Sequence, residues 1–436
     1  MFLEDLFHLA ENNTNIRQEI LAGFTTWLTM VYIVAINPQI LSAGGMDFQS
    51  VFVATCCAAA VGSLVMGLLA NYPIALAPGM GLNVFFVYTV VLSMGLSWQT
   101  ALGAVFWSGV LFLLLSVSKV REQIINSMPS SIKVGAAIGI GLFLAVIGLE
   151  HASIIVKGTG TLMKLGNVHS LPVILTTLGF ILITALHIRG KSWAVIAGIL
   201  VVACAGWLFD DATRFKGIIS FALPSMSQIF LKLDLSVHFD VVFLTVVLSF
   251  LFVDLFDTSG TLVAVAKKGG FEDEAGNIPR VGRALLADST ASVAGALMGT
   301  STTTSYIESN AGIAAGGRTG LTAVVVAVLF LLTLFFYPLA ESIPVYATAP
   351  ALIFVAILLV GTFSHFNDWD DFSESAPLIT TAIMMPLTFS ITDGLSAGCV
   401  IYVFIKLLAG RYREIGSTMI VLTIAFLLRY IFLVNF

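Results

Sequence analysis

Apolar segments, most of them about 20 residues long, alternate with short polar stretches along almost the whole chain. A helix of about 20 apolar residues is long enough to cross the hydrocarbon core of a bilayer. The pattern therefore predicts an all-α, polytopic membrane protein. The segments comprise residues 19–41, 51–70, 74–95, 98–118, 133–155, 170–187, 191–209, 240–266, 283–299, 304–316, 319–338, 347–363, 375–391, 393–409 and 417–434.

A more polar stretch near the middle separates seven of these segments from seven others, and one further segment follows. Because seven is odd, the second set enters the membrane from the opposite side, which is typical of the inverted repeats of transporters. In chain order, the pattern predicts an N-terminal amphipathic segment 1–18, a first seven-helix repeat 19–209, a connecting segment 210–239, a second repeat 240–409 and a C-terminal part 410–436 with a basic loop and a hydrophobic segment.

Composition and charge support this interpretation and add an orientation. The chain is 58% hydrophobic and 10% charged, with a mean hydropathy of +1.00, whereas a soluble domain has about 25% charged residues. Most of the 20 Lys and Arg residues fall in one alternate set of loops, which the positive-inside rule places in the cytoplasm together with the N-terminus. We expect a plasma-membrane or inner-membrane protein without a cleaved signal peptide, since no basic region precedes an apolar core near residue 1. The basic residues of the other loops are Lys157, Lys164, Arg214, Lys216 and Lys232.

The third segment of each half is interrupted. In the first half, a Pro-Gly pair at 78–79 precedes Asn83, and in the second half residues 301–320 are rich in hydroxyl side chains and glycine and contain Glu308. Broken backbone at membrane depth persists only where it is buried in protein or lines a cavity. Two interrupted segments at corresponding positions therefore indicate the binding site of a transporter.

Three acidic residues inside apolar segments form the strongest candidate site. Asp254 and Asp257 are three residues apart, which places them on one face of a helix, and Glu308 lies in the second interrupted segment. Acidic residues at membrane depth usually mark a substrate or ion path. Asp257, followed by Thr258 and Gly260, is favoured over a structural ion pair because no Lys or Arg lies within its apolar run. Asp254 is either a partner that tunes Asp257 or a structural hydrogen-bonding residue, and Glu308 is favoured as a site residue over an exposed loop residue.

Other polar and aromatic residues near these positions carry weaker predictions. Asn83 is predicted to contact the substrate rather than to be a satisfied buried amide. Tyr306 and Phe256 are candidate stacking platforms. Asp288 is predicted to be a structural residue that forms hydrogen bonds between helices, and Asn37, which precedes a proline, is predicted to cap or kink the first helix.

Motifs of several other protein classes are absent from the sequence. There is no Walker loop, no nucleophile–base set and no His cluster, and the four cysteines lie in apolar runs without metal-ligand spacing. We therefore expect neither ATP-driven transport, nor an enzyme, nor a metal site. Carboxylates, hydroxyls and an amide without a basic residue beside them suit a small ligand that donates hydrogen bonds rather than an anion. A buried carboxylate can also take up a proton on one side and release it on the other. These residues predict a symporter, coupled to protons or to Na⁺, that carries a neutral or weakly basic ring or an amine. They do not determine which of the two ions is the coupling ion.

Six stretches also carry a family resemblance: GFTTWLTMVYIVAINPQIL, ALAPGMGLN, VDLFDTSGTL, YIESNAGIAAGGRTGLTAVVV, ATAPALIFV and FSITDG. With them the chain resembles, over nearly its whole length, the AzgA-like purine permeases of the nucleobase–cation symporter group, which also contains the uracil permeases. The resemblance implies fourteen core helices in two inverted repeats, with a core domain (helices one to four and eight to eleven) that moves against a gate domain (helices five to seven and twelve to fourteen). It also implies proton symport of purine nucleobases without a cofactor, and a homodimer.

The same resemblance assigns roles to particular positions. Asp257 matches the acidic residue of helix eight and Glu308 that of helix ten, both of which contact the base in relatives, and Asn83 matches a polar position of helix three. ALAPGMGLN and FSITDG are similar to adenine-type members and favour adenine. Asp254 stands where close adenine-type relatives are expected to have Asn. This difference leaves the substrate range and the ion coupling of the protein undecided. The implied proton-coupling residues are Asp257, Glu308 and Asp254. The predicted substrate-binding residues are Asp257, Glu308, Asn83, Phe256, Tyr306, Thr258 and Gly260.

Several alternatives stay open beside adenine–proton symport. A guanine/hypoxanthine or broad-range purine permease is the first of them, and Na⁺ coupling is another. An anion transporter of the same fold should have a basic residue at the site and usually a large soluble C-terminal domain. A passive channel would tolerate the loss of Asp257. No nucleic-acid partner is predicted, and the partners expected are the purine base, the lipid bilayer and a second copy of the chain.

Overall fold

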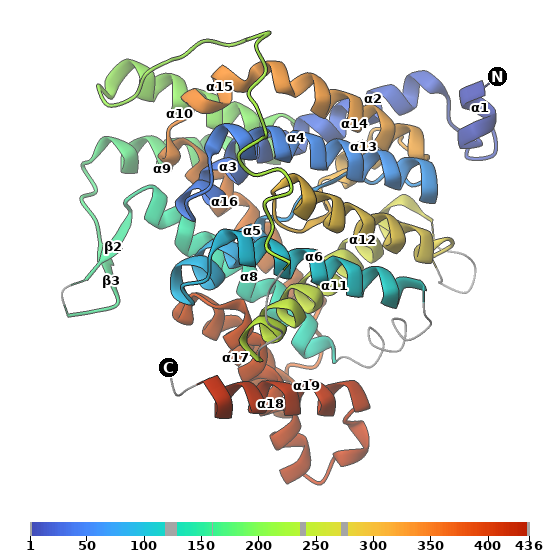
Figure 1. The fold of residues 1–436 in the computed structure, drawn as a ribbon, viewed down its shortest axis with the longest axis vertical. Helices are drawn as coiled ribbons and strands as arrows, with labels where there is room; N and C mark the ends of the chain where they lie inside the picture. The colour runs from blue at the N-terminus through green and yellow to red at the C-terminus, as the bar shows by residue number, and fades with distance from the viewer. Residues whose placement is uncertain (1, 118–128, 159, 236–240, 272–277, 434–436) are drawn as a thin grey trace.

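The apolar segments fold into helices that pack into one bundle (Figure 1). The structure, a computed structural model, describes residues 2–117, 129–158, 160–235, 241–271 and 278–433. The helices of the first half are α1 (Phe2–Phe7), α2 (Ile16–Met30), α3 (Ile33–Ala43), α4 (Phe48–Val65) continued by the π-helical segment η1 (Met66–Ala70), α5 (Met80–Val84) continued by the π-helical segment η2 (Phe85–Ser93), α6 (Trp98–Val117), α8 (Ser130–His151), α9 (Leu171–Ile188) and α10 (Ala194–Phe209).

The second half repeats this arrangement of long helices around one interrupted segment. Its helices are α11 (Val241–Gly269), α12 (Val281–Met298), α13 (Ser309–Ala314), α14 (Gly320–Thr333) with the 3₁₀ turn η3 (Leu334–Phe336), α15 (Tyr337–Ser342), α16 (Val345–Val360) with the 3₁₀ turn η4 (Gly361–His365), α17 (Phe372–Thr388), α18 (Ile391–Leu408), the 3₁₀ turn η5 (Tyr412–Glu414) and α19 (Ser417–Leu433).

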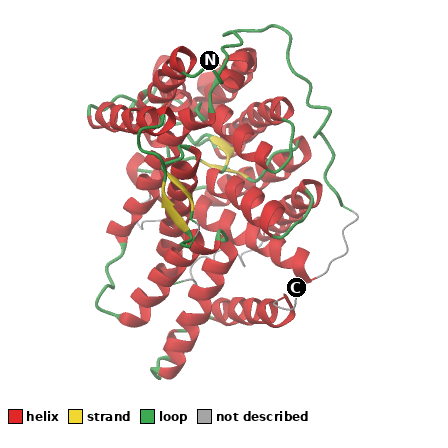
Figure 2. Ribbon diagram, turned by 90° about the vertical axis from the view of Figure 1, so that its left-hand side faces the viewer, coloured by secondary structure: helices red, strands yellow, loops and turns green. Residues whose placement is uncertain are grey.

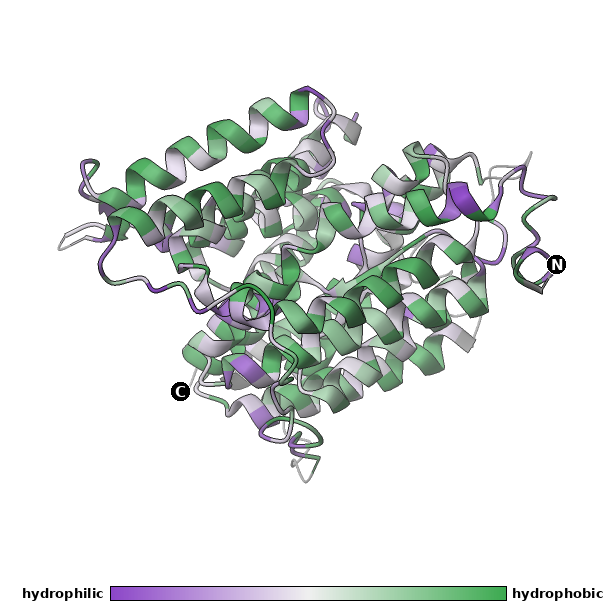
Figure 3. Ribbon diagram, turned by 90° about the horizontal axis from the view of Figure 1, so that it is seen from above, coloured by the Kyte–Doolittle hydropathy of each residue, from purple (hydrophilic) through white to green (hydrophobic). Residues whose placement is uncertain are grey.

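Each predicted apolar segment corresponds to one or more of these elements, so the prediction of an all-α, multi-pass membrane protein is confirmed. Within the described residues, nine helices are long and apolar enough to cross a membrane, and two shorter apolar helices, Met80–Ser93 and Ala194–Phe209, accompany them. Figure 3 shows hydrophobic residues along most of the helix length and hydrophilic residues mainly in loops and at helix ends. The number of fourteen membrane helices and the bounds of the two repeats stay predictions.

The first apolar segment forms one membrane-length span, Ile16–Ala43, that an irregular turn divides into α2 and α3. The chain turns at Val31 and Tyr32, between α2 and α3, whereas the sequence predicted a cap or kink at Asn37 and the following proline. Asn37 instead lies inside α3, fully buried, and its Nδ2 donates hydrogen bonds to the hydroxyls of Thr55 (2.7 Å) and Thr300 (3.0 Å). The earlier break places the Tyr32 side chain at the level of the second interrupted segment.

The two interrupted segments meet as a pair of short strands (Figure 2). Strand β1 (Leu76–Pro78) pairs antiparallel with β4 (Thr303–Ser305), in the register Leu76↔Ser305, Ala77↔Thr304 and Pro78↔Thr303. This pairing satisfies backbone groups that no helix could satisfy at membrane depth. The residue after β1 must be Gly79, because a Cβ there would lie 2.6 Å from Cγ2 of Thr304. A second small hairpin, β2 (Ile155–Lys157) with β3 (Met163–Leu165), lies in the α8–α9 connection.

The long helices sort into two groups by their packing. In the first group, α14 packs against α2 and α4, and α12 packs against α4 and α6, while α11 contacts α6, α13 and β4. In the second group, α8 packs against α16 and α17, α17 packs against α18, and α9 packs against α10 and α16. We call these the first helix group (α2–α6 and α11–α14) and the second helix group (α8–α10 and α16–α18). The paired strands belong to the first helix group.

Candidate functional site

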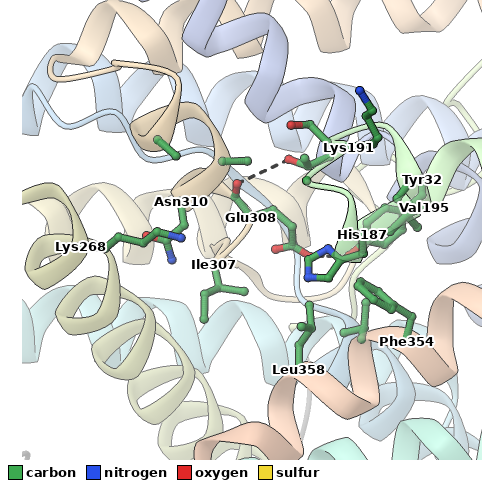
Figure 4. A pocket seen from close by; sticks show the side chains of 17 residues that line it. Tyr32, His187, Lys191, Val195, Lys268, Ile307, Glu308, Asn310, Phe354 and Leu358 are labelled. Carbon is green, nitrogen blue, oxygen red and sulfur yellow. Dashed lines mark hydrogen bonds between the residues drawn. The ribbon is translucent and has the colours of Figure 1, made fainter. Parts of the chain in front are cut away.

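A cavity of about 480 Å³ lies between the two helix groups (Figure 4). The first helix group contributes one wall, from the α2–α3 junction, the end of α11 and helix α13. The second helix group contributes the other wall, from the α9–α10 turn and the second half of α16. A concave space between two packed units is a common place for a small ligand.

Glu308 is the predicted site residue that lines this cavity. It directly precedes α13, and its Oε1 accepts a 2.6 Å hydrogen bond from the hydroxyl of Tyr32 (Figure 4). Such a short bond to a carboxylate is charge-assisted and holds the side chain in one orientation. A carboxylate has about four acceptor positions, so Glu308 can accept from Tyr32 and from an N–H group of a ligand at the same time.

Helix α13, which carries Glu308, is held closely against α2. A side chain at Gly312 would overlap the Thr26 hydroxyl and the Ala22 carbonyl group of α2, so the close approach requires glycine. At the other end, Oε2 of the buried Glu19 accepts hydrogen bonds from the hydroxyl (2.6 Å) and the N–H group (3.2 Å) of Thr322, and its Oε1 accepts one from the N–H group of Arg318 (2.9 Å). A carboxylate at the start of α14 satisfies N–H groups that lack partners within the helix.

Sequence reasoning missed this role of Glu19. A signal was present, because Glu19 is an acidic residue at the start of a long apolar segment and the run after Glu308 ends in a basic residue and two hydroxyls. Its partners are about 300 residues away along the chain, however, and the sequence pattern did not connect them.

Asp257 lies on α11, near Glu308 but not on the wall of the cavity. Its carboxyl group lies beside the hydroxyl of Thr304 and is close enough to Asp288 and Glu308 for direct electrostatic interaction. Thr258 donates a 2.7 Å hydrogen bond to Oδ2 of Asp288, and its hydroxyl lies 3.0 Å from that of Thr304. The four side chains on α11, α12 and β4 therefore form one polar group near Glu308, in which Thr258, Asp288 and Thr304 are buried and Asp257 is partly exposed.

Two further acidic residues have structural partners in the same region. Oδ1 of Asp288 accepts hydrogen bonds from the N–H group and the hydroxyl of Ser305, both at 2.9 Å, so this residue joins α12 to β4 as well as to α11. Asp254 is fully buried, and its Oδ2 accepts a 3.2 Å hydrogen bond from the hydroxyl of Ser292 on α12. Asp254 does not line the cavity.

The remaining predicted residues lie outside the cavity wall in this conformation. Asn83 is buried, its Oδ1 accepts a hydrogen bond from Ser301, and its Nδ2 has no hydrogen-bond partner among the described residues. Tyr306 is buried with its hydroxyl donating to the carbonyl group of Pro78 (2.6 Å), so it supports β1 instead of offering an open face. Gly260 is exposed and faces open space. The side chain of Phe256 lies outside the described residues.

The wall contributed by the second helix group was not predicted. Phe354 of α16 lies on it, with the ring of His187 edge-on at 4.9 Å between centroids. Asn310, two residues after Glu308, lines the cavity from the opposite side (Figure 4). Asn310 could have been found from its spacing to Glu308. His187 and Phe354 could not, because only the tertiary fold brings α9 and α16 to face α13.

Two lysines correct one element of the sequence argument. The sequence suggested that no basic residue lies at the site, but Lys191 of the α9–α10 turn and Lys268 of α11 both line the cavity, with exposed side chains. The hydrated ammonium groups of such lysines stay at the solvent end of a pocket. An anionic ligand can therefore no longer be excluded on the ground that the site lacks a basic residue. The choice between ligand classes rests on other observations.

Two solved structures share this arrangement of helices. The chain superposes on the transmembrane domain of the cyanobacterial bicarbonate transporter BicA with a TM-score of 0.65 and 16% sequence identity, over 88% of this chain and 97% of that one. It superposes on SLC26A9 with a TM-score of 0.62 and 10% identity, over 90% of this chain and 66% of that one. These similarities define the fold, which is of the kind found in uracil permeases.

Sequence relatives give the family. Residues 17–396 match the Xan_ur_permease permease family, and the chain belongs to this family of nucleobase permeases. The adenine permease AdeP of Escherichia coli is 47% identical over 99% of this chain and 96% of its own length. The guanine/hypoxanthine permease PbuO of Bacillus subtilis is 44% identical over 97% of this chain and 99% of its own length. The putative permease MJ0326 of Methanocaldococcus jannaschii is 49% identical over 99% of both chains. The predicted family is thus confirmed.

Proposed function

We propose that the protein is a secondary active transporter that couples the uptake of purine nucleobases, adenine above all, to protons by alternating access. The observation that carries this proposal is the position of Glu308, which is held by Tyr32 at the wall of a cavity between two separately packed helix groups. Relatives described as adenine permeases, 47% identical over nearly the full length, support adenine as the substrate.

The chemistry of the cavity suits a planar base. Carboxylates accept hydrogen bonds from the ring N–H and amino groups of a purine, and Glu308 has acceptor positions beyond the one that Tyr32 occupies. The amide of Asn310 can exchange donor and acceptor groups with ring nitrogens. Phe354 offers an apolar ring on the opposite wall. In this proposal the base lies between Glu308 and the second helix group.

The boundaries of the cavity support alternating access. Its walls come from two helix groups, so a movement of one group against the other would close it on one side and open it on the other. With the N-terminus in the cytoplasm, as the basic loops favour, the α9–α10 turn and the end of α11 face the cytoplasm. Lys191 and Lys268 then lie at a cytoplasmic mouth, and this conformation is inward-open.

Protons are the coupling ion in this proposal, and the carboxyl groups near the cavity are the candidate carriers. Asp257 and Glu308 lie close enough to interact electrostatically, so a proton on either of them relieves repulsion between the two. Asp254 is the third candidate, further from the cavity at the α11–α12 contact. The proposal includes a homodimer in the cell membrane, to be checked by the mass of the purified protein in a single detergent micelle.

A guanine/hypoxanthine permease is the second candidate function. The relatives PbuO and PbuG of Bacillus subtilis, both described as guanine/hypoxanthine permeases, are 44% identical over 97% and 99% of this chain, only slightly less than the adenine permeases. The cavity has hydrogen-bonding groups that could serve either base. Competition between bases in one transport experiment separates the two functions.

The test is uptake of labelled adenine into cells that lack their own purine permeases. Unlabelled adenine should block the uptake, and hypoxanthine, guanine and uracil should not. Block by every purine would make the protein a broad purine carrier, and no adenine uptake with the protein present in the membrane would overturn the adenine proposal. A protonophore should abolish accumulation while replacement of Na⁺ should not, and the reverse result would make the protein a sodium symporter.

A further inference from the structure

Three hydrogen-bonded contacts join the two helix groups at a distance from the cavity. In the first contact, the Gln39 side chain of α3 accepts a 2.7 Å hydrogen bond from the hydroxyl of Thr348 on α16 and donates one of 3.0 Å to the carbonyl group of Ile343. Thr348 is 1% exposed, so this contact is formed inside the protein and not in water.

The other two contacts come from consecutive residues of η2. The hydroxyl of Tyr88 lies 3.2 Å from Nε2 of His151 at the end of α8. The hydroxyl of Thr89 donates a 2.7 Å hydrogen bond to the carbonyl group of Phe389, the residue that follows α17. We call the set formed by Gln39, Tyr88, Thr89, His151, Thr348 and the Phe389 carbonyl group the outer latch.

The direction of the helices places these contacts on one side. Gln39, Tyr88, Thr89, His151 and Phe389 all lie near the C-terminal ends of segments that start on the N-terminal side of the membrane, and Thr348 lies at the start of a segment that runs back. The cavity mouth with Lys191 and Lys268 lies at the opposite ends of the segments. One side of the boundary between the groups is therefore open, and the other is closed by hydrogen bonds.

A hydrogen bond across such a boundary contributes to the balance between two conformations. When the groups separate on the outer side, the Thr348 hydroxyl keeps only the carbonyl group of Val345 on its own helix (2.8 Å), and the side-chain oxygen of Gln39 loses its donor and must find water instead. Each such bond therefore favours the state in which the groups stay together, by a factor of about two to ten in the ratio of the two populations.

We propose that the outer latch is the closed outer gate of the transporter, and that it must break each time the site becomes accessible from outside. This inference rests on the alternating-access mechanism proposed above. Weakening the latch should shift the population away from the inward-open state without changing any group that lines the cavity.

The experiment reads the inward-open population from a cysteine in the cavity. Ala314 of α13 lines the cavity and is exposed, so Ala314→Cys, in a chain whose four native cysteines are replaced, can be labelled by a membrane-impermeant maleimide in inside-out vesicles. Thr348→Val removes the hydroxyl at nearly constant volume, and Tyr88→Phe removes the second contact. The matched control is Thr348→Ser, which keeps the hydroxyl.

The equilibrium should shift about two- to tenfold toward the outward-open state in Thr348→Val and in Tyr88→Phe, and further in the double variant, so labelling slows by up to that factor; in Thr348→Ser it stays unchanged. Unchanged labelling in both single variants and in the double variant, or equal slowing by Ser and Val at position 348, would overturn the latch. Whether adenine protects the cysteine of Ala314→Cys from the maleimide tests the proposed function separately. If adenine gives no protection while the latch variants slow labelling, the substrate assignment fails and the gate stands.

Discussion

The hydroxyl of Tyr32 donates a 2.6 Å hydrogen bond to Oε1 of Glu308, across 276 residues of sequence. Two breaks in the chain produce this contact, the turn between α2 and α3 and the strand–helix transition before α13. One break supplies the donor and the other supplies the acceptor. The candidate site thus depends on irregular backbone in both halves of the chain.

Removal of the Tyr32 hydroxyl should weaken transport. In Tyr32→Phe, Glu308 loses a charge-assisted donor and gains freedom to rotate, which predicts a loss of roughly tenfold or more in the ratio of maximal rate to KM for adenine. The measurement is initial-rate uptake at several adenine concentrations, corrected for the amount of protein in the membrane. Tyr412→Phe, at an exposed position of η5, is the control. Wild-type kinetics in Tyr32→Phe would show that the contact has no part in transport.

The two acidic residues nearest the site should be required for accumulation. Glu308→Gln and Asp257→Asn keep shape but lose the charge and the proton-carrying group, so we expect both variants to insert normally and to lose roughly 100-fold or more of adenine accumulation. The measurement is adenine uptake divided by the amount of transporter in the membrane, and Asp370→Asn on an exposed loop is the control. Normal accumulation by either variant would remove that residue from the site.

Loss of Glu19 should lower the stability of the fold rather than act directly on transport. Glu19→Ala removes the carboxylate that accepts from the N–H groups of Arg318 and Thr322 and from the Thr322 hydroxyl, and it leaves Thr322 with bonds to backbone carbonyl groups only, which predicts a loss of about 2–3 kcal/mol. Thermal unfolding of the protein in detergent should therefore occur several degrees lower. Glu11→Ala removes a carboxylate that is 78% exposed and should leave the unfolding temperature unchanged. Equal unfolding temperatures for Glu19→Ala and the wild type would contradict the role of this cap.

Ion pairs beyond the ends of α17 and α18 should make stability depend on pH. The hydroxyl of Ser373 and the guanidinium of Arg411 hold the pKa of Asp371 well below its usual 3.8, and Arg411 and Lys406 lower the pKa of Glu414 from its usual 4.5. Arg411 contacts both carboxylates, at 2.6 Å and 2.7 Å. Because the folded state favours the charged forms, their contribution is present at neutral pH and is lost as the pH falls through and below these usual values.

Arg411→Gln tests this dependence. The variant should unfold at a lower temperature than the wild type at neutral pH, and the difference should shrink below about pH 4, where the unfolded chain binds protons that the folded wild type does not. The measurement is the unfolding temperature in detergent between pH 7 and pH 3. Arg413→Gln, at an exposed neighbouring position, is the control. A difference that stays constant across this range would exclude the carboxylate partners as its cause.

Much of the fold could be read from the sequence because bilayer length and charge constrain it directly. The apolar segments became helices, and the two interrupted segments became a paired strand unit, since glycine and proline leave backbone groups that need a partner at membrane depth. Glu308 was found for the same reason, as a carboxylate inside such a segment. The break at Val31 and Tyr32 was not found, because its residues are apolar or aromatic and carry no turn signal.

The parts that escaped prediction depend on contacts between distant segments. The wall with His187 and Phe354 exists only when α9 and α16 pack together, and the two lysines at the cavity mouth come from the α9–α10 turn and the end of α11, which only the fold brings near each other. Asp257 is the opposite case, a residue that the sequence indicated but that does not line the cavity. Its sequence signal is the strongest in the chain, yet it lies behind Glu308 and not on the cavity wall in this conformation.

The pairing of β1 with β4 has a consequence for synthesis in the cell. About 225 residues separate the two strands, so the backbone groups of Leu76–Pro78 wait for their partners while those residues are translated. At about 5–20 residues per second this takes roughly 10 to 45 s. During that time the first half is held in the membrane or its insertion machinery with an unfinished centre. The first half of the chain therefore cannot complete its folding before β4 of the second half has been made.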